Sequence, residues 1–253
     1  MLEQVVGKRG GSMPDEMFFF IADISGYTQY MVRNQMEHDH GILMINELMT
    51  ALVNEVALPM EISKLEGDAI FLYLSYEKLS AEMHNDPRLL TEKILRFFTT
   101  FQRKLNAMQE GSACDCGACA NLSSLNIKII AHFGKASMVK IGPFMELSGV
   151  DVILVHRLLK NQVKERRYLL LTDAAYQKLK LPAEGKLVQS EESDKDIGNV
   201  KVYVYFPPEG VPPPEKKELT VWKKIQNHTK LFVGTALLKL GKKGDRHYHN
   251  FPK

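Results

Sequence analysis

The chain has 253 residues, of which 45% are hydrophobic, and a formal net charge of +3. This length and hydrophobic content suffice for one sizeable folded domain with appendages. No apolar run approaches the roughly 18 residues that a membrane-spanning helix needs, and residues 1–16 lack the apolar stretch of a secretory signal. We therefore expect a cytoplasmic protein.

The charge is unevenly distributed along the chain. Residues 215–253 contain ten Lys or Arg and three Asp or Glu, a local charge of +7, while the remainder holds 23 basic and 27 acidic residues, a local charge of −4. The proline-rich stretch Pro207–Lys217 before the basic segment is typical of an extended linker. We therefore expect a mobile N-terminus (1–16), a folded domain (17–206), a linker (207–218) and a basic C-terminal helix or tail (219–253).

Within the folded domain, hydrophobic periodicity and turn residues predict alternating strands and helices. Helices covering one face of a largely antiparallel sheet fit this order, which is an α/β fold of the α+β sandwich type. In chain order, we expect a strand at Phe18–Asp23, a helix at His40–Val56, a hairpin of Leu58–Ser63 and Ala69–Leu74, a helix from Asp86-Pro87 with an apolar stripe from Leu90 to Met108, strands at Leu125–Phe133 and Ser137–Ile141 around Gly134, a helix at Asp151–Asn161, a strand at Tyr168–Leu171, a short helix near Asp173–Leu179, and a strand at Val200–Phe206.

Two aspartates stand at the edges of predicted strands. Asp23 follows the apolar run Phe18–Ala22, and Asp68 precedes the run Ala69–Leu74. A carboxylate at the end of a buried strand is unfavourable without a partner, and two of them on adjacent strands suit a divalent cation that carries a phosphate. Each aspartate taken alone also fits an ordinary helix cap or turn.

Three segments in this order resemble motifs of the class III nucleotidyl cyclases, the catalytic domain of adenylyl and guanylyl cyclases. They are FIADISGYT at Phe20–Thr28, KLEGD at Lys64–Asp68 and ELSGVDVILVHRLLKN at Glu146–Asn161. AHFGKA at Ala131–Ala136 is similar to the strand and turn before the third motif. The chain also resembles an uncharacterised bacterial branch of this superfamily with a C-x-C-x-x-C insertion. The resemblance covers about residues 18–206 and implies a ferredoxin-like cyclase domain.

The resemblance implies metal-dependent conversion of a purine nucleoside triphosphate, with ATP expected, to its 3′,5′-cyclic monophosphate and pyrophosphate. Asp23 and Asp68 would bind two Mg²⁺ or Mn²⁺ ions, with help from the backbone carbonyl of Ile24. The backbone around Gly26 would let phosphate oxygens approach N–H groups.

Further residues are implied to bind the substrate. Lys64 and Glu146 stand where adenylyl cyclases place the lysine and the aspartate that contact adenine. Arg157 would be catalytic by binding phosphate oxygens as the charge migrates. Lys195 is a candidate for the lysine that contacts the triphosphate.

The chain departs from the family pattern at one position of the third motif. The family places an asparagine four residues before the arginine, and this chain has Ile153 there. Loss of one such hydrogen bond commonly costs roughly 3 kcal/mol, or about a hundredfold in rate. His156 or Asn161 of the same predicted helix could substitute for it. The sequence is therefore consistent with an active cyclase of altered efficiency or with a cyclase-homology module that binds a nucleotide or a partner without turnover.

The resemblance also implies a homodimer with composite sites. In the family, two domains pair head to tail with two-fold symmetry. Asp23 and Asp68 of one chain would face Lys64, Glu146 and Arg157 of its mate.

A cluster of three cysteines raises a separate question. Cys114, Cys116 and Cys119 could supply three ligands to zinc or to an iron–sulfur cluster, with the fourth from Asp115, a histidine elsewhere or a dimer mate. Three reduced loop cysteines are the alternative. We interpret the His38-Asp39-His40 cluster as a polar helix start rather than a metal site.

The basic C-terminal segment Leu219–Leu240 mixes lysines with apolar residues. Such a helix could lie on a membrane surface, but its apolar stripe is not clean, which favours packing on the domain or on a partner. We find no groove-reading nucleic-acid motif, and so expect no nucleic-acid partner.

Overall fold

The structure is a computed structural model that describes residues 14–57, 59–82, 86–111, 114 and 116–208. The predicted basic tail, and the predicted linker beyond residue 208, lie outside the described residues. Within the described ranges, no helix has the length and the apolar content needed to cross a membrane.

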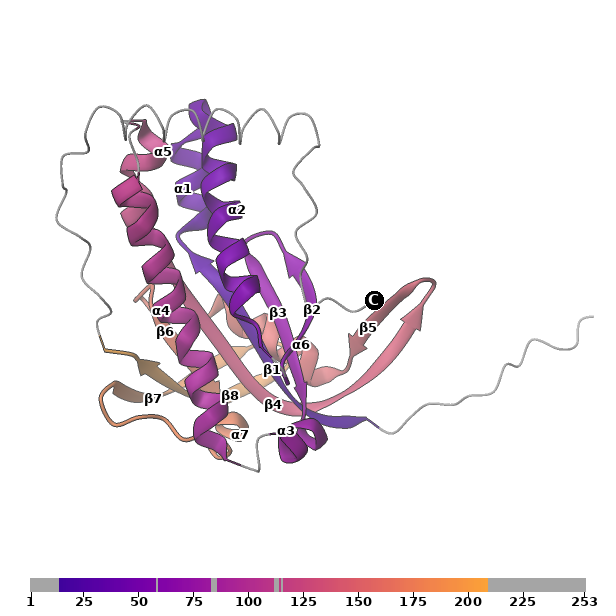
Figure 1. Cartoon of the computed structure of the whole chain (residues 1–253). Coiled ribbons are helices and arrows are strands. Elements are labelled where there is room, and N and C mark those ends of the chain that lie inside the picture. The colour runs from indigo at the N-terminus through magenta and orange to yellow at the C-terminus, as the bar shows by residue number, and fades with distance from the viewer. Residues whose placement is uncertain (1–13, 58, 83–85, 112–113, 115, 209–253) are drawn as a thin grey trace, which may run out of the picture.

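The described chain forms strands and helices in mixed order along the sequence (Figure 1). Their bounds are β1 (Asp15–Ser25), α1 (Tyr27–Arg33), α2 (His38–Glu55), β2 (Glu61–Glu66), β3 (Ala69–Ser75), α3 (Tyr76–Glu82), α4 (Pro87–Gly111), α5 (Gly117–Ala120), β4 (Asn126–Ile141), β5 (Phe144–Ser148), α6 (Val150–Arg157), β6 (Tyr168–Thr172), α7 (Asp173–Tyr176), β7 (Lys186–Asp194) and β8 (Gly198–Phe206). Short 3₁₀ turns lie at Gln35–Glu37, Leu122–Ser124 and Leu158–Lys160.

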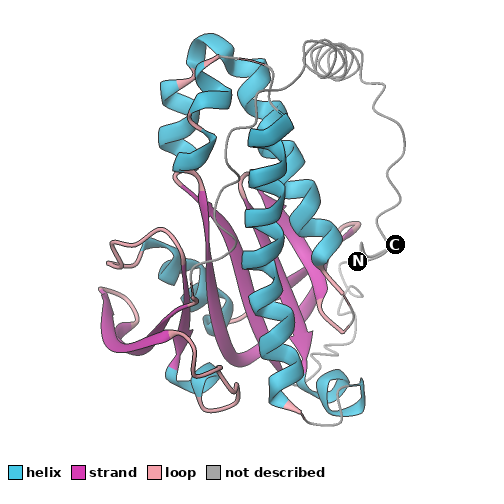
Figure 2. Ribbon diagram, turned by 60° about the vertical axis from the view of Figure 1, so that its left-hand side comes forward, coloured by secondary structure: helices cyan, strands magenta, loops and turns pink. Residues whose placement is uncertain are grey.

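The strands form one mixed sheet in the order β2-β3-β1-β4-β6-β8-β7, and β5 pairs with the outer part of β4. All pairs are antiparallel except β4 with β6. The first four core strands, with α2 and α4 as their crossovers, have the ferredoxin-like order, which confirms the predicted fold class. Figure 2 shows the two long helices lying across the sheet.

Strand β1 is buried on both faces, which explains its continuous apolar run. Phe18 and Phe20 pack into the larger core beneath α2 and α4, whereas Phe19 and Ile21 pack into a smaller core on the opposite face with α6. Because side chains alternate along a strand, Asp23 continues the row of Phe19 and Ile21. Asp23, the first predicted site residue, therefore lies on the same face of the sheet as the smaller core.

Helix α4 confirms the apolar stripe expected from the sequence. It begins at Pro87, and its buried residues face α2 and the sheet, where each fully buried large side chain contributes roughly 1.5–3 kcal/mol. The buried stripe is Leu90, Ile94, Phe97, Phe98, Phe101 and Leu105.

Other element boundaries differ from those predicted. Strand β1 begins at Asp15, inside the segment expected to be mobile, and β2 begins at Glu61. Strand β4 continues through Gly134, where two strands were expected, because β1 pairs with it as far as Ala136. The missing side chain of Gly134 leaves room for Asp151 of α6 to pack against the strand. The helix at the third motif ends at Arg157.

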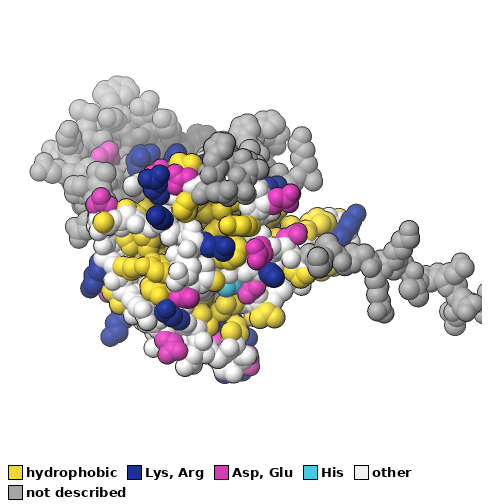
Figure 3. Space-filling model, turned by 90° about the horizontal axis from the view of Figure 1, so that it is seen from below, with side chains coloured by type: hydrophobic (Ala, Val, Ile, Leu, Met, Phe, Trp, Pro, Cys, Tyr) yellow, Lys and Arg dark blue, Asp and Glu magenta, His cyan; other side chains and the backbone are white. Residues whose placement is uncertain are grey.

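The outer part of β4 and strand β5 form an arm that projects from the sheet (Figure 1). Several large apolar side chains of this arm and of the start of α6 are exposed, and the view from below shows hydrophobic side chains at the surface among charged ones (Figure 3). The exposed set is Val139, Ile141, Phe144, Met145, Val150 and Ile153.

Candidate active site

The two predicted metal-binding aspartates lie together. Asp23 is near the end of β1, and Asp68 occupies the tight turn between β2 and β3, next to Ala69, which pairs with Asp23. The backbone N–H of Ile24 donates to the carbonyl oxygen of Asp68 at 3.1 Å, which fixes the turn against the strand. Burial, followed by the negative charge of Asp23, raises the pKa of Asp68 to about 6.

A lysine that the sequence analysis did not single out completes this group. Lys128 of β4 faces Asp23 across the strand pair, and its Nζ lies 3.0 Å from Asp23 Oδ2. The same ammonium donates to the carbonyl oxygen of Leu159 at 3.1 Å. A signal was present in the sequence, because Lys128 interrupts an otherwise apolar strand between Ile127 and Ile129.

The predicted base-contacting residues also lie together within one chain. Lys64 Nζ of β2 is 3.7 Å from Glu146 Oε2 of β5 and 3.3 Å from Glu66 Oε1. The side chains of Lys64 and Glu146 are 42% and 40% exposed, so both remain accessible to a ligand. A register shift in β2 between Ile62 and Lys64 precedes this pair.

Arg157, at the end of α6, pairs with the turn between β7 and β8. Its guanidinium lies 3.7 Å from Asp194 and 3.4 Å from Asp196. Lys195 lies between these aspartates and is exposed. Ile153, one turn before Arg157, is 53% exposed and places an apolar surface where the family has an amide.

The two suggested substitutes for the missing asparagine have other partners. His156 Nε2 lies 3.2 Å from Glu66 Oε1, and its Nδ1 lies 2.8 Å from the carbonyl oxygen of Val152. Asn161 caps the 3₁₀ turn after α6, where its amide nitrogen donates to Leu158 and its Oδ1 accepts from Tyr168. Both side chains are engaged in these contacts, so neither takes the place of the missing asparagine in this structure.

A buried histidine fixes the position of α6. His132 Nε2 lies 3.0 Å from Asp151 Oδ1, and its Nδ1 lies 2.8 Å from Thr172 Oγ1. The other oxygen of Asp151 accepts the backbone N–H of Lys135 at 2.6 Å. Burial lowers the pKa of His132, although Asp151 opposes that shift. This contact joins α6 to β4 and therefore positions Ile153 and Arg157.

Gly26 forms the left-handed turn between β1 and α1, with φ of 88°. A side chain there would lie 3.0 Å from the carbonyl oxygen of Ser124 and 3.1 Å from Nη1 of Arg166. Arg166 donates to Ser124 and to Gln29. The guanidinium of Arg166 therefore lies beside the turn that phosphate oxygens are predicted to approach. The sequence analysis did not identify this residue.

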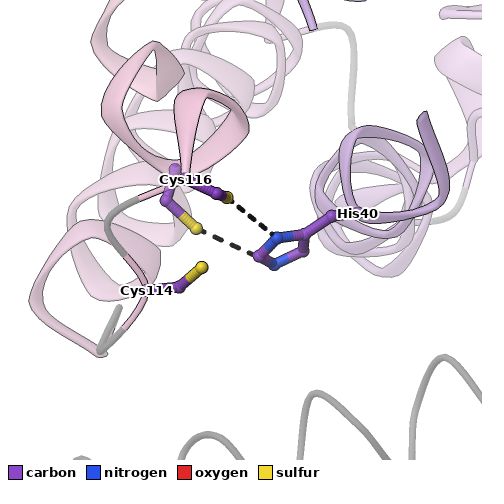
Figure 4. A group of neighbouring side chains, drawn as sticks. His40, Cys114 and Cys116 are labelled. Carbon is purple, nitrogen blue, oxygen red and sulfur yellow. Dashed lines mark hydrogen bonds between the residues drawn. The ribbon is translucent and has the colours of Figure 1, made fainter. Parts of the chain in front are cut away.

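The cysteine cluster lies at the far end of the helical layer. Cys114, Cys116 and Cys119 gather around His40 of α2, and their ligand atoms all lie within 4.8 Å of one another (Figure 4). Helix α2 does begin at His38, as expected from a polar helix start. His40 of this segment lies beside the three thiols, so it is a candidate for the fourth ligand, which the sequence analysis left open to a histidine elsewhere in the chain.

Two sequence comparisons give relatives without a known activity. Residues 45–168 match a family described as protein of unknown function (DUF2652). An uncharacterized protein of Mycobacterium tuberculosis, Rv2561/Rv2562, is 35% identical over 125 residues, which are 49% of this chain and 56% of that protein. The chain therefore spans little more than half the length of this relative.

Solved structures give the fold. The guanylyl cyclase Cya2 has a TM-score of 0.58 at 13% identity, over 83% of this chain and all of that one. The adenylyl cyclase CyaB from P. aeruginosa has a TM-score of 0.53 at 13% identity, over 80% and 98%. A bacterial light-regulated adenylyl cyclase has a TM-score of 0.54 at 14% identity, over 88% of this chain and 57% of that one. The described domain therefore has the fold of adenylyl and guanylyl cyclase domains.

Proposed function

We propose that this chain is a class III nucleotidyl cyclase-like enzyme that converts a purine nucleoside triphosphate, with ATP expected, to its 3′,5′-cyclic monophosphate and pyrophosphate. The observation that carries the proposal is the placement of Asp23 and Asp68 side by side, close enough for the charge of Asp23 to raise the pKa of Asp68. Such a pair of carboxylates at a partly exposed strand end can hold the divalent cations that phosphate chemistry uses.

The donor set fits a hard divalent cation. Asp23 and Asp68 offer carboxylate oxygens, and the single ammonium of Lys128 balances only part of their charge. These two aspartates, with the carbonyl of Ile24, would hold Mg²⁺ or Mn²⁺. Bound there, the ions would activate the attacking 3′-hydroxyl and neutralise charge on the triphosphate.

The remaining residues would bind and orient the nucleotide. The ammonium of Lys64 would donate to a ring nitrogen of adenine, and the carboxylate of Glu146 would accept from the exocyclic amine. Their 3.7 Å contact places both groups where one base could reach them. Arg157 would bind phosphate oxygens in exchange for Asp194 and Asp196. Lys128 and the exposed Lys195 would add positive charge near the triphosphate.

The proposed active form is a homodimer with composite sites. Arg157 pairs with the β7–β8 turn of its own chain, whereas Asp23 pairs with Lys128. A mate in the head-to-tail arrangement would bring its Arg157, Lys64 and Glu146 to the aspartates. The exposed apolar residues of the β4–β5 arm and the start of α6 support a protein interface on this side.

Ile153 supports a second candidate, a nucleotide-binding module without turnover. Its exposed apolar side chain cannot hydrogen-bond a ribose, and both His156 and Asn161 have other partners. This module would retain binding at the aspartates and at Lys64 but would release the triphosphate unchanged.

The two candidates are distinguished by product formation. The purified full-length chain is incubated with each of the four nucleoside triphosphates and Mn²⁺, and cyclic products are detected by mass spectrometry. Cyclic AMP from ATP supports the enzyme. Binding of a non-cleavable ATP analogue without product supports the module.

Calorimetry tests the metal site itself. Asp23→Asn and Asp68→Asn should each abolish Mn²⁺-dependent binding of a non-cleavable ATP analogue, while Asp86→Asn, just before the start of α4, should leave binding unchanged. Unchanged affinity in both active-site variants would refute the site.

A further inference from the structure

The cysteine cluster joins segments that are distant in the sequence. His40 is in the first turn of α2, Cys114 follows the end of α4, Cys116 precedes α5, and Cys119 lies within α5. The Sγ of Cys116 lies 3.1 Å from His40 Nδ1, and the Sγ of Cys119 lies 3.7 Å from His40 Nε2. Figure 4 shows His40 pointing from its helix toward the thiols of Cys114 and Cys116.

Contacts outside the cluster hold these side chains in place. The carboxylate of Glu37 accepts the backbone N–H groups of Gly117 and Ala118, at 3.1 and 2.9 Å. The hydroxyl of Tyr30 donates to the carbonyl oxygen of Ala118 at 3.0 Å. Since these bonds do not involve the thiols, they dock the cysteine loop on the α1–α2 corner and preorganise the ligand atoms.

Close packing at Gly117 also holds the cysteine loop against the α1–α2 corner. A side chain at this position would lie 2.9 Å from both Asn34 Oδ1 and Glu37 Oε2. The glycine allows the loop between Cys116 and Cys119 to approach this close, which brings both thiols to His40. The arrangement therefore depends on contacts between the Glu37 carboxylate and a backbone segment about eighty residues further along the chain.

We propose that His40, Cys114, Cys116 and Cys119 form a structural zinc site, separate from the proposed nucleotide site. Three thiolates and one imidazole are a preferred ligand set for tetrahedral zinc. Zn–S and Zn–N bonds of the usual lengths place neighbouring ligand atoms about 3.6–3.8 Å apart. The observed ligand atoms, all within 4.8 Å of one another, need only small shifts to reach these distances, and the 3.1 Å contact between Cys116 and His40 would lengthen.

The ligand count assigns the site a structural role. Four protein ligands leave no open position for water or substrate, whereas catalytic zinc sites keep one. Cys119 is only 8% exposed, and the cluster lies at one end of α2 and α4. Zinc would bind the end of α4 to the start of α2 and so would stabilise the helical layer that covers the larger core.

Elemental analysis of the full-length protein, purified without a polyhistidine tag, provides the test. We expect about one zinc per chain. His40→Ala and Cys116→Ser should lose at least about tenfold in zinc affinity. His38→Ala is the matched control, because His38 is an exposed histidine on the same helix and should retain full zinc content.

A second measurement remains informative if the variants fold poorly. X-ray absorption of the zinc-loaded wild type should show three sulfur ligands and one nitrogen. Iron with the visible absorption of a cluster, no bound zinc, or zinc held without sulfur would each overturn the proposal. Asp23→Asn should keep its zinc, so failure of the nucleotide site and failure of the zinc site give different results.

Discussion

The ammonium of Lys128 lies 3.0 Å from a carboxylate oxygen of Asp23, and the two residues face each other across strands β1 and β4. Their side chains are only 20% and 15% exposed, so neither charge is well solvated. Removing one partner of a buried ion pair leaves the other without compensation. Without Lys128, the carboxylate of Asp23 would remain uncompensated beside the carboxylate of Asp68.

We therefore expect Lys128→Met to destabilise the fold by about 2 kcal/mol at pH 7.5. In an Asp23→Asn background the same change should cost less, with a coupling energy of about 1–2 kcal/mol. Urea unfolding of both single variants and the double variant measures this coupling. Lys135→Met, at an exposed lysine of the same strand, is the control. Additive losses would show that Lys128 and Asp23 do not interact.

The raised pKa of Asp68 predicts a specific pH dependence. Its pKa of about 6 in the folded protein exceeds the usual value near 3.8, so between these two pH values the folded state binds more protons than the unfolded chain. The contribution of Asp68 to stability therefore falls as the pH rises from about 4 to about 6. Allowing for solvent screening, we expect this loss to amount to about 1–2 kcal/mol.

Asp68→Asn cannot ionise and should escape this loss. Its stability relative to the wild type should therefore rise between pH 4 and pH 7 in urea unfolding without divalent cations. Asp86→Asn is a suitable control. Arg88 lowers the pKa of Asp86, so replacing Asp86 with Asn should produce no gain in relative stability over this pH range. A constant difference between wild type and Asp68→Asn over this range would contradict the raised pKa that burial and the charge of Asp23 give Asp68.

Ile153→Asn tests whether one residue limits turnover. Ile153 is 53% exposed, so the substitution removes little buried apolar surface and should leave stability nearly unchanged. If the missing amide is the limiting feature, kcat should rise by up to about a hundredfold, since one transition-state hydrogen bond contributes roughly 3 kcal/mol. Val150→Asn, at a residue of the same helix that is 70% exposed, is the control. If kcat is unchanged in Ile153→Asn, the missing amide is not what limits turnover.

Local patterns were sufficient to predict much of this fold. The apolar stripe of α4 and the buried run of β1 follow from periodicity, and Asp23 and Asp68 meet because both lie at strand ends of the same sheet. Strand β7 was missed because it is mostly exposed and has no alternating apolar pattern. Its position depends on pairing with β8 rather than on its own burial.

The features that sequence analysis missed are contacts between distant segments. Lys128 meets Asp23 only through the register of β1 with β4, and His40 meets Cys116 only when the loop after α4 packs on α2. Gly134 was taken for a turn, although it lies within β4 and makes room for Asp151. None of these contacts leaves a periodic signal in its own segment.

The last prediction concerns assembly. If each proposed site combines the aspartates of one chain with Arg157 of its mate, then Asp23→Asn and Arg157→Ala should each be inactive alone. In a mixed dimer, the site made from the aspartates of the Arg157→Ala chain and the arginine of the Asp23→Asn chain is intact. The second site carries both defects.

Mixing equal amounts of the two variants should therefore restore activity. With random pairing about half the dimers are mixed and each has one intact site, so the recovered rate should approach about a quarter of the wild-type rate. Subunit exchange is verified by native mass spectrometry of the mixture, and Asp23→Asn mixed with Asp68→Asn is the control that should stay inactive. A strictly monomeric protein by light scattering at micromolar concentration, or exchanged subunits without recovered activity, would refute composite sites.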